Sequence, residues 1–398
     1  MIICSVFGLP AQMYCNVPRQ VGATYKSLWT KVKQNIEAIK TGRTKKRYKW
    51  LDRVPKFASR TCTLNYKRDY SFVKDKVSLI TLSGRIKVNY SGYSKHLELI
   101  KKSAKIGAAK IWYDQGKKNY YLLVSLNLEV PEIKPEDIKQ IKGVDVGQRY
   151  LAVATNPQNQ TQFFSGKQVR HKANKYHKAR KTLQQKGTRS AKRRLISLSG
   201  RERRFTADVN HSISARIVSA STLIGLENLK HIRQRTNRPS NKKAHRPRRG
   251  LLGVRTEQEA SVKQRRANQN QSKWAFAELH SYCDYKAILS GSLAVKVPAQ
   301  LTSQCCPKCG HVSQENRPNK RLIFRCVACH HTLHSDLVGA RNITLRTLLL
   351  RQDFESTGRI SAVPSVSHEE TKANYLSRFL ELRWSADAIP TFSVSKAG

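Results

Sequence analysis

The sequence predicts an α/β protein with several domains, and three observations support this prediction. Hydrophobic residues recur at helical spacing near the N-terminus and at a spacing of two farther along, which indicates a helix followed by strands. With 398 residues and a hydrophobic content of 39%, the chain is long and apolar enough for two or three folded domains. Two pairs of cysteines near the C-terminus indicate a further small unit.

The N-terminal region, residues 1–140, is expected to combine a helix with a small antiparallel sheet or barrel. Residues 18–41 carry hydrophobic side chains at helical spacing, and Gly42 ends the pattern. From 77 to 130 the period changes to two, with turn residues between the segments. The strands are predicted at residues 77–82, 86–90, 109–113 and 120–126. A polar linker at 131–140 ends the region.

A second domain is expected at residues 141–300, completed by a helix at 334–350. Short apolar runs bounded by glycine or polar residues favour buried strands in this domain. These strands are predicted at residues 141–146, 150–155, 223–227 and 294–297. Helices are predicted within 167–216 and at 274–287, and a basic loop rich in Asn, Pro and Gly is predicted at 231–256.

The C-terminal part is expected to hold a cysteine-rich ribbon at 301–333 and a tail at 351–398 that is partly disordered. Within the tail, the composition predicts a linker at 352–370 and a weakly amphipathic helix at 371–384. The ribbon therefore lies between the main part of the second domain and the helix that completes it.

The chain is strongly basic, with 75 Lys and Arg against 26 Asp and Glu and a net charge of +49. A polyanion would neutralise this charge, so nucleic acid is the leading partner and an anionic membrane a distant second. A structural protein of the ribosomal kind is the alternative for any very basic chain. No stretch approaches the roughly 18 apolar residues of a membrane span. The nine cysteines do not suggest a secreted disulfide framework, so we expect a cytoplasmic, reducing compartment.

Four cysteines have the spacing of a zinc site. Cys306 and Cys309 stand in C-P-K-C-G, and Cys326 and Cys329 follow, after sixteen intervening residues, in C-V-A-C-H. Two such pairs can close a tetrahedron around Zn²⁺, and four protein ligands make the zinc structural rather than catalytic. The alternative is four unrelated cysteines. One thiol could also be replaced by a neighbouring histidine, of which there are four: His311, His330, His331 and His334.

Three carboxylates on separate elements are candidates for chemistry. Asp145 stands within a predicted strand, where aspartate is disfavoured, so it must be paired, capped or on a metal; alternatively it caps Gly147. Glu227 ends an apolar strand and could simply be exposed. Asp336 follows the ribbon and could cap the next helix together with Ser335. If the three converge, they suit two Mg²⁺ ions about 3.5–4 Å apart, as in phosphodiester cleavage.

Five segments together resemble a known family. They are G-V-D-V-G-Q-R-Y-L-A at 143–152, L-I-G-L-E-N-L at 223–229, T-S-Q-C-C-P-K-C-G at 302–310, F-R-C-V-A-C at 324–329 and H-S-D-L-V-G-A-R-N-I at 334–343. In this order they resemble TnpB, the OrfB-type protein of insertion sequences that has long been called a transposase. The resemblance extends to the compact type V CRISPR effectors and covers about residues 9–385.

The resemblance implies an RNase H-like (RuvC) nuclease core with the zinc ribbon inserted before its last carboxylate. Asp145, Glu227 and Asp336 match the family's catalytic residues and would hold two Mg²⁺ ions. The implied activity is RNA-guided cutting of DNA, with a guide RNA from the transposon end and target DNA as partners. The N-terminal region would be the recognition and wedge-like part, which holds guide RNA and reads a short motif beside the target.

The basic segment 167–216 fits a role in contacting nucleic-acid phosphates. It contains 16 Lys and Arg residues and only two acidic residues; a solvated basic helix is the alternative. The candidate contact residues are Arg180, Lys181, Arg189, Arg193, Arg194, Arg201, Arg203 and Arg204.

The chain departs from the family pattern in three ways. It begins late, without the usual first strand and opening helix; an upstream start or a genuine truncation would both explain this, and we expect a truncation to weaken the reading of the flanking motif. Cys305 replaces the usual threonine, and Val338 stands where asparagine is common. Two further hypotheses therefore stay open: a truncated relic that binds RNA or DNA without cleaving it, and a transposase that itself joins strands.

Overall fold

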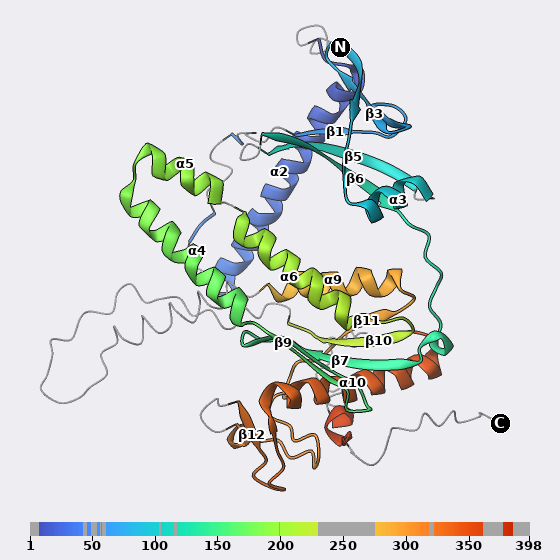
Figure 1. Ribbon diagram of the computed structural model, residues 1–398, viewed down its shortest axis with the longest axis vertical. Coiled ribbons are helices and arrows are strands. Elements are labelled where there is room, and N and C mark those ends of the chain that lie inside the picture. Colours follow the sequence, from blue (N-terminus) through green and yellow to red (C-terminus); the bar gives the residue numbers. More distant parts are fainter. Residues whose placement is uncertain are drawn as a thin grey trace, which may run out of the picture. The chain divides into compact units, whose positions relative to one another are not determined.

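A computed structural model describes the two units of the chain (Figure 1). The described residues are 8–42, 46–48, 54–55, 57, 61–102, 105–114, 118–198, 200–229, 275–317, 322–360 and 377–384. The chain divides into two compact units, Met1–Glu129 and Val130–Gly398. The segment after Val130, predicted to be a linker, holds a 3-10 turn at Pro135–Asp137 and Ile138, which is buried in the core of the second unit.

The first unit contains a long helix and two antiparallel sheets. Helix α2 (Ala11–Lys40) begins earlier than the predicted residue 18, and Pro18 lies inside the helix. One sheet has the order β1-β5-β6 and the other β2-β3-β4. The strands and the second helix are β1 (Thr61–Leu64), β2 (Tyr70–Val73), β3 (Lys76–Thr81), β4 (Gly84–Asn89), α3 (Ser94–Lys102), β5 (Lys105–Asp114) and β6 (Asn119–Asn127).

The four strands predicted in the first unit are present, and three elements were missed: β1, β2 and α3. The described strands form two sheets rather than one. Leu64, Tyr70 and Val77 form the buried centre of the unit, together with partly buried residues of β5 and β6. The Tyr70 hydroxyl donates to the carbonyl of Gly107 at 2.7 Å, which ties the two sheets together.

The second unit is built on one mixed sheet of five strands, in the order β11-β10-β7-β8-β9. Strands β7, β10 and β11 run parallel, whereas β8 and β9 are antiparallel to their neighbours. The strands are β7 (Gln140–Asp145), β8 (Tyr150–Thr155), β9 (Thr161–Ser165), β10 (Thr222–Glu227) and β11 (Leu293–Val297). Four of them agree with the predicted segments, and β9 was missed.

Helices cover both faces of this sheet (Figure 1). On one face, α6 and α9 pack against Val144, Ile224 and Leu226. On the other face, α10 packs against Leu223 and Val295. The helices are α4 (Lys167–Lys186), α5 (Arg189–Leu198), α6 (Arg201–Ile217), α9 (Phe276–Leu289) and α10 (Ser335–Thr357). Because neighbouring strand residues point to opposite faces, the odd-numbered residues 223, 225 and 227 of β10 face α10.

The C-terminal part differs from the prediction in its boundaries. Helix α10 continues to Thr357, so residues 352–357 of the predicted linker are helical, and Gly358 ends the helix in the left-handed conformation. Within 377–384, residues 377–381 form a short helix. The predicted basic loop at 231–256 lies outside the described residues. No helix in the described part of the chain is both long and apolar enough to cross a membrane.

Candidate functional site

Asp145 and Glu227 lie side by side at the carboxyl ends of two parallel strands. In the register of β7 and β10, Gly225 pairs with Gly143 and Leu226 with Val144, so the next residues along are Glu227 and Asp145. Both carboxylates follow a glycine by two residues and therefore face the same side of the sheet as that glycine. This is the side that α10 covers.

Helix α10 approaches the sheet closely because β7 and β10 carry no side chain at the contact. A Cβ at Gly143 would lie 2.3 Å from the backbone nitrogen of Thr344, and a Cβ at Gly225 would lie 1.7 Å from Oγ1 of Thr347. At Gly143 a larger residue would require the backbone of the helix to move, and at Gly225 the Thr347 side chain would have to shift. Two glycines paired across neighbouring strands thus form a flat surface that sets the height of α10 above the sheet.

The first turn of α10 brings Asp336 to the two strand carboxylates. A Cβ at Gly339 would lie 2.9 Å from Cγ of Asp145, so this turn rests on the Asp145 carboxyl group. Asp336 and Glu227 each act electrostatically on Asp145 and raise its pKa. The structure therefore brings together all three predicted carboxylates. The predicted helix cap at Asp336 or Ser335 is wrong, because the side chain of His334 accepts the hydrogen bond from the Asp336 backbone N–H.

The carboxylates repel one another and favour protons or a cation. Loss of solvent raises the pKa of Asp145 well above its ordinary value, and the neighbouring charges of Glu227 and Asp336 raise it further. The charge of Arg317 and a hydrogen bond from the Val146 backbone act in the opposite direction. Burial raises the pKa of Glu227 to about 7. Oxygen ligands in such surroundings suit a hard divalent cation, which would relieve the repulsion.

Glu227 is held by the segment that follows β11. The hydroxyl of Thr302 donates to Oε1 of Glu227 at 2.8 Å. Nδ2 of Asn342 donates to the carbonyls of Thr302 and Cys305 at 2.7 and 2.9 Å, which fixes this segment on α10. The Arg346 guanidinium donates to the carbonyls of Pro298 and Gln300, and its charge lowers the pKa of Glu227. Helix α10 thus carries Asp336 itself, contacts Asp145 at Gly339, and acts on Glu227 through Asn342 and Arg346.

The four cysteines lie close enough for one metal ion. Their sulfur atoms are all within 4.8 Å of one another, with 3.7 Å between Cys306 and Cys329 and 3.5 Å between Cys309 and Cys326. Zinc–sulfur bonds of about 2.3 Å place tetrahedral sulfurs about 3.8 Å apart. Among the described residues this is the one group of three or more potential ligands that is so tight, which means the three carboxylates are more widely spread.

Each cysteine pair forms the same turn. In the first, the backbone N–H of Gly310 donates to the carbonyl of Cys306 at 2.8 Å; in the second, that of His330 donates to the carbonyl of Cys326 at 3.0 Å. Gly310 and His330 both have positive φ, at 79° and 56°. The ribbon strands β12 (Ile323–Arg325) and β13 (Thr332–His334) flank the second turn and pair with each other, and β13 leads directly into α10.

The ribbon shares its core with α10. Val338 is fully buried and packs with Phe324, Cys306 and Cys326. An asparagine there, as in the family pattern, would need a hydrogen-bond partner in this apolar cluster, so valine is a consistent replacement. Cys305, the other departure, is buried beside the ribbon, and burial raises its pKa.

A short C-terminal segment, 377–384, fastens the ribbon to the rest of the unit. The Trp384 backbone N–H donates to the carbonyl of Pro307 at 2.7 Å, and its indole N–H donates to Oδ1 of Asn159 at 2.9 Å. The Phe379 ring lies 5.1 Å from the guanidinium of Arg346. Trp384 and Phe379 are both buried. The segment therefore connects the ribbon, the β8–β9 turn and the arginine that faces Glu227.

The predicted basic residues lie on three successive helices, α4, α5 and α6 (Figure 1). One of them, Arg180, pairs with Glu202 at 2.6 Å and thus links α4 to α6. The other seven are exposed, namely Lys181, Arg189, Arg193, Arg194, Arg201, Arg203 and Arg204. They form a basic surface on the second unit.

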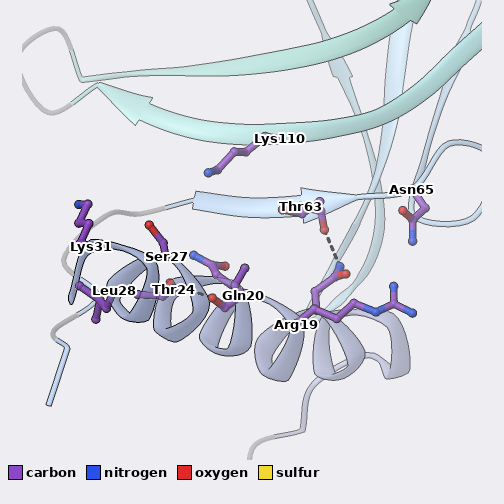
Figure 2. A pocket seen from close by; sticks show the side chains of 11 residues that line it. Arg19, Gln20, Thr24, Ser27, Leu28, Lys31, Thr63, Asn65 and Lys110 are labelled. Atoms are coloured by element: carbon purple, nitrogen blue, oxygen red, sulfur yellow. Dashed lines mark hydrogen bonds between the residues drawn. The ribbon is translucent and has the colours of Figure 1, made fainter. Parts of the chain in front are cut away.

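The first unit has a polar groove between α2 and strands β1 and β5, with a volume of about 660 Å³ (Figure 2). Asn16 of α2, which also lines the groove, donates to the carbonyl of Thr63 at 2.8 Å and ties the helix to β1. The lining has three cationic residues and no acidic one: Arg19, Lys31 and Lys110. Such a groove suits a phosphate backbone.

Two family profiles match the chain. The family described as "Probable transposase" matches residues 125–237, which contain Asp145 and Glu227. The family described as "Cas12f1-like, TNB domain" matches residues 276–343, which contain the four cysteines and Asp336. The resemblance to TnpB/OrfB-type proteins is confirmed.

Curated proteins similar to this chain are named as Cas12f endodeoxyribonucleases or TnpB-like proteins. The CRISPR-associated endodeoxyribonuclease Cas12f1 of Sulfoacidibacillus thermotolerans is 24% identical over 294 residues, which is 69% of this chain and 60% of the relative. Cas12f2 of Micrarchaeota archaeon is 26% identical over 250 residues, or 58% of this chain and 41% of the relative. A TnpB-like protein of Methanocaldococcus jannaschii is 23% identical over 222 residues, which is 53% of this chain and 70% of the relative. The chain thus spans less than two thirds of either Cas12f relative.

Solved structures overlap with the chain in part. A cryo-EM structure of a Cas12f1–sgRNA–target DNA complex has a TM-score of 0.36 and 16% identity, and covers 73% of this chain and 68% of that one. A structure of the mini-RNA-guided endonuclease CRISPR-Cas_phi3 has a TM-score of 0.39 and 12% identity, and the match covers 74% of this chain and 58% of that one.

The residues that support the carboxylates were missed in the sequence. Thr302, Asn342 and Arg346 all hold the site through contacts between separate elements. One signal was available: α10 carries polar residues at buried positions, including Asn342, Thr344, Arg346 and Thr347. A polar residue buried in a helix needs a partner, so such positions indicate contacts to another segment.

Proposed function

We propose that this chain is a zinc-containing, Mg²⁺-dependent, RNA-guided DNA endonuclease of the TnpB type, encoded by an insertion sequence. The observation that carries the proposal is the convergence of Asp145, Glu227 and Asp336 on the face of the sheet that α10 covers. In a chain of net charge +49, these three carboxylates form an acidic site that would bind divalent cations next to the phosphates of a nucleic acid.

The strand arrangement supports an RNase H-like (RuvC) core. Three antiparallel strands, β7 to β9, are followed by β10, which pairs in parallel with the other edge of β7, and by β11, which pairs in parallel with β10. Helix α10 completes this core after the ribbon, so the domain comprises residues 141–300 and 334–350 with the ribbon at 301–333 inserted. Because Val338 at the start of α10 packs against the ribbon, the ribbon would help to position Asp336.

The site residues would have different roles in DNA cleavage. Two bound Mg²⁺ ions would supply an activated water and stabilise the leaving oxygen, which yields a 5′-phosphate and a 3′-hydroxyl. Asp145, Glu227 and Asp336 would hold the ions. Thr302 orients the Glu227 carboxylate through its hydrogen bond. The closed set of four cysteines leaves its zinc no open position, so that zinc would be structural.

The basic surfaces would hold the nucleic acids. The seven exposed cations of α4 to α6 would contact the phosphates of the guide RNA or of its duplex with target DNA. The groove lined by Arg19, Lys31 and Lys110 would hold guide RNA or the duplex that flanks the target. A steep loss of RNA affinity with rising salt is the expected signature of such contacts.

The test is cleavage of a plasmid library with randomised flanks by protein co-expressed with the transposon-end RNA. Guide-dependent cuts beside one enriched motif, present with Mg²⁺ and absent without added divalent ion, are the expected result. Bound RNA without any cut, with zinc in place, would contradict the nuclease and favour a binder that does not cleave. Joined rather than cut ends would favour a strand-joining transposase.

A further inference from the structure

The side chain of His334 connects three parts of the second unit. It stands where β13 meets α10, and its Nδ1 accepts a hydrogen bond from the backbone N–H of Asp336 at 3.2 Å. Its ring packs edge-on against Tyr150 and Phe163, with 5.3 Å between ring centroids in both cases. Tyr150 begins β8 and Phe163 lies in β9. The ribbon, the β8–β9 hairpin and the first turn of α10 therefore meet at one imidazole.

A histidine is an unusual residue at this position. The side chains that normally accept the first helical N–H belong to Ser, Thr, Asp or Asn, and Ser335 and Asp336 stand next in the chain. Because His334 accepts this hydrogen bond, the Asp336 carboxylate is free to act as a ligand. The ring has a second nitrogen, Nε2, besides the Nδ1 that accepts this hydrogen bond. That Nε2 is buried and has no hydrogen-bond partner within the described part of the chain.

We propose that His334 is a positioning residue, which holds Asp336 in place for a divalent cation by capping α10 while Tyr150 and Phe163 fix its ring. The inference rests on the proposed role of Asp336 as a metal ligand. The first turn of a helix frays when its N–H groups lack acceptors, and ligand groups tolerate only about 0.5 Å of displacement. The cap therefore bears directly on whether the third carboxylate stays beside the other two.

Three variants separate capping from packing. His334→Phe keeps a ring between Tyr150 and Phe163 but removes the acceptor. His334→Asn keeps an acceptor for the Asp336 N–H but removes the ring. The control is His96→Asn, which changes an exposed histidine of α3 in the first unit.

The experiment measures Mn²⁺ affinity by calorimetry on the full chain with its zinc in place, and hydrogen exchange over residues 334–340. His334→Phe is expected to weaken Mn²⁺ binding about tenfold and to speed exchange, because loss of a supporting residue typically costs 10–100-fold in metal affinity. His334→Asn should stay within about threefold of the wild type, since it restores the cap. Mn²⁺ binding by His334→Phe at the wild-type affinity would overturn the proposal.

Cleavage separates this inference from the proposed function. If the wild-type chain binds Mn²⁺ in a manner that requires the His334 cap but cuts no DNA, the positioning role stands and the nuclease proposal fails. If the wild-type chain cuts DNA and His334→Phe cuts equally well at every Mn²⁺ concentration, the nuclease stands and the positioning role fails.

Discussion

The zinc ribbon and the carboxylate site are assembled in different ways. The four cysteines lie within residues 306–329, and each pair is shaped by hydrogen bonds inside its own turn. The three carboxylates come from residues 145, 227 and 336, and meet only because α10 rests on two paired glycines. The first site is local in sequence, whereas the second is a property of the whole fold. Changes far from the carboxylates should therefore disturb the acidic site, while the zinc should depend on its own turns.

The largest expected effect is the loss of cleavage in Asp145→Ala. Removal of one metal ligand should lower the cleavage rate about 10³-fold or more, since metal coordination contributes several kcal/mol to such reactions. RNA binding should stay nearly unchanged. The folded chain without divalent ion should be no less stable than the wild type, because Asp145 is desolvated and repelled by Glu227 and Asp336. Rates, RNA affinity and thermal unfolding measure these three effects.

The matched control is Asp75→Ala, which removes an exposed carboxylate of the first unit. It should leave all three quantities unchanged. Simultaneous loss of RNA binding and stability in Asp145→Ala would indicate misfolding and would break the distinction between the two sites.

The next effect concerns the dependence of the acidic site on the ribbon. Cys326→Ser should abolish zinc binding and unfold the ribbon, because structural zinc contributes directly to folding. Cleavage should fall too, since Val338 and His334 join the ribbon to the start of α10. Zinc content by elemental analysis and cleavage rate give the comparison. Cys15→Ser, at an exposed cysteine, is the control, and full activity of zinc-free protein would contradict the coupling.

The sequence predicted the local site better than the assembled one. The spacing of Cys306, Cys309, Cys326 and Cys329 alone predicted a zinc cluster, because the turns that shape it are short. The three carboxylates were found individually, yet each had an equally simple explanation as a turn, surface or cap residue. Only the resemblance to a family joined them, since periodicity shows which face of a strand is buried but not which helix covers it.

The supporting contacts could not be predicted for the same physical reason. Thr302 and Arg346 act across segments far apart in the chain, and so does the His334 ring where it packs against β8 and β9. Each of these residues has many possible partners. The glycines were visible, but the need for Gly143 and Gly225 follows only from the register that pairs them and from the helix above. The predicted strands are present because apolar patterning is a local signal, whereas the short strands β1, β2 and β9 were missed.

A smaller effect tests the glycine surface. Gly225→Ala should destabilise the fold by about 1–3 kcal/mol, the usual cost of overpacking, because the new Cβ meets Thr347. Mn²⁺ affinity should fall as α10 moves, whereas zinc content should not change. The double variant Gly225→Ala with Thr347→Ala should recover part of the loss. Gly22→Ala, where a Cβ meets nothing within 4 Å, is the control and should not be destabilising.

Chemical unfolding and calorimetry measure these changes. Equal destabilisation by the single and double variants would show that the close contact with Thr347 does not set the position of α10.

A last effect is the pH dependence of Glu227. Its pKa in the fold is about 7, above the ordinary value of 4.5, so the folded state binds the proton more tightly than the unfolded state. Without divalent ion, stability should therefore fall as pH rises from about 4.5 to about 7. Glu227→Gln, which cannot ionise, should show a flatter profile. Mn²⁺ should reduce the slope in the wild type, and identical profiles of the two proteins would contradict the assignment.

The most direct measurement is anomalous diffraction from crystals of the full chain with its nucleic acids, grown with Mn²⁺. The account predicts one zinc peak among the four cysteines and manganese peaks among Asp145, Glu227 and Asp336. A zinc peak at the cysteines with manganese absent from the three carboxylates would contradict the claim that the fold assembles them into a metal site.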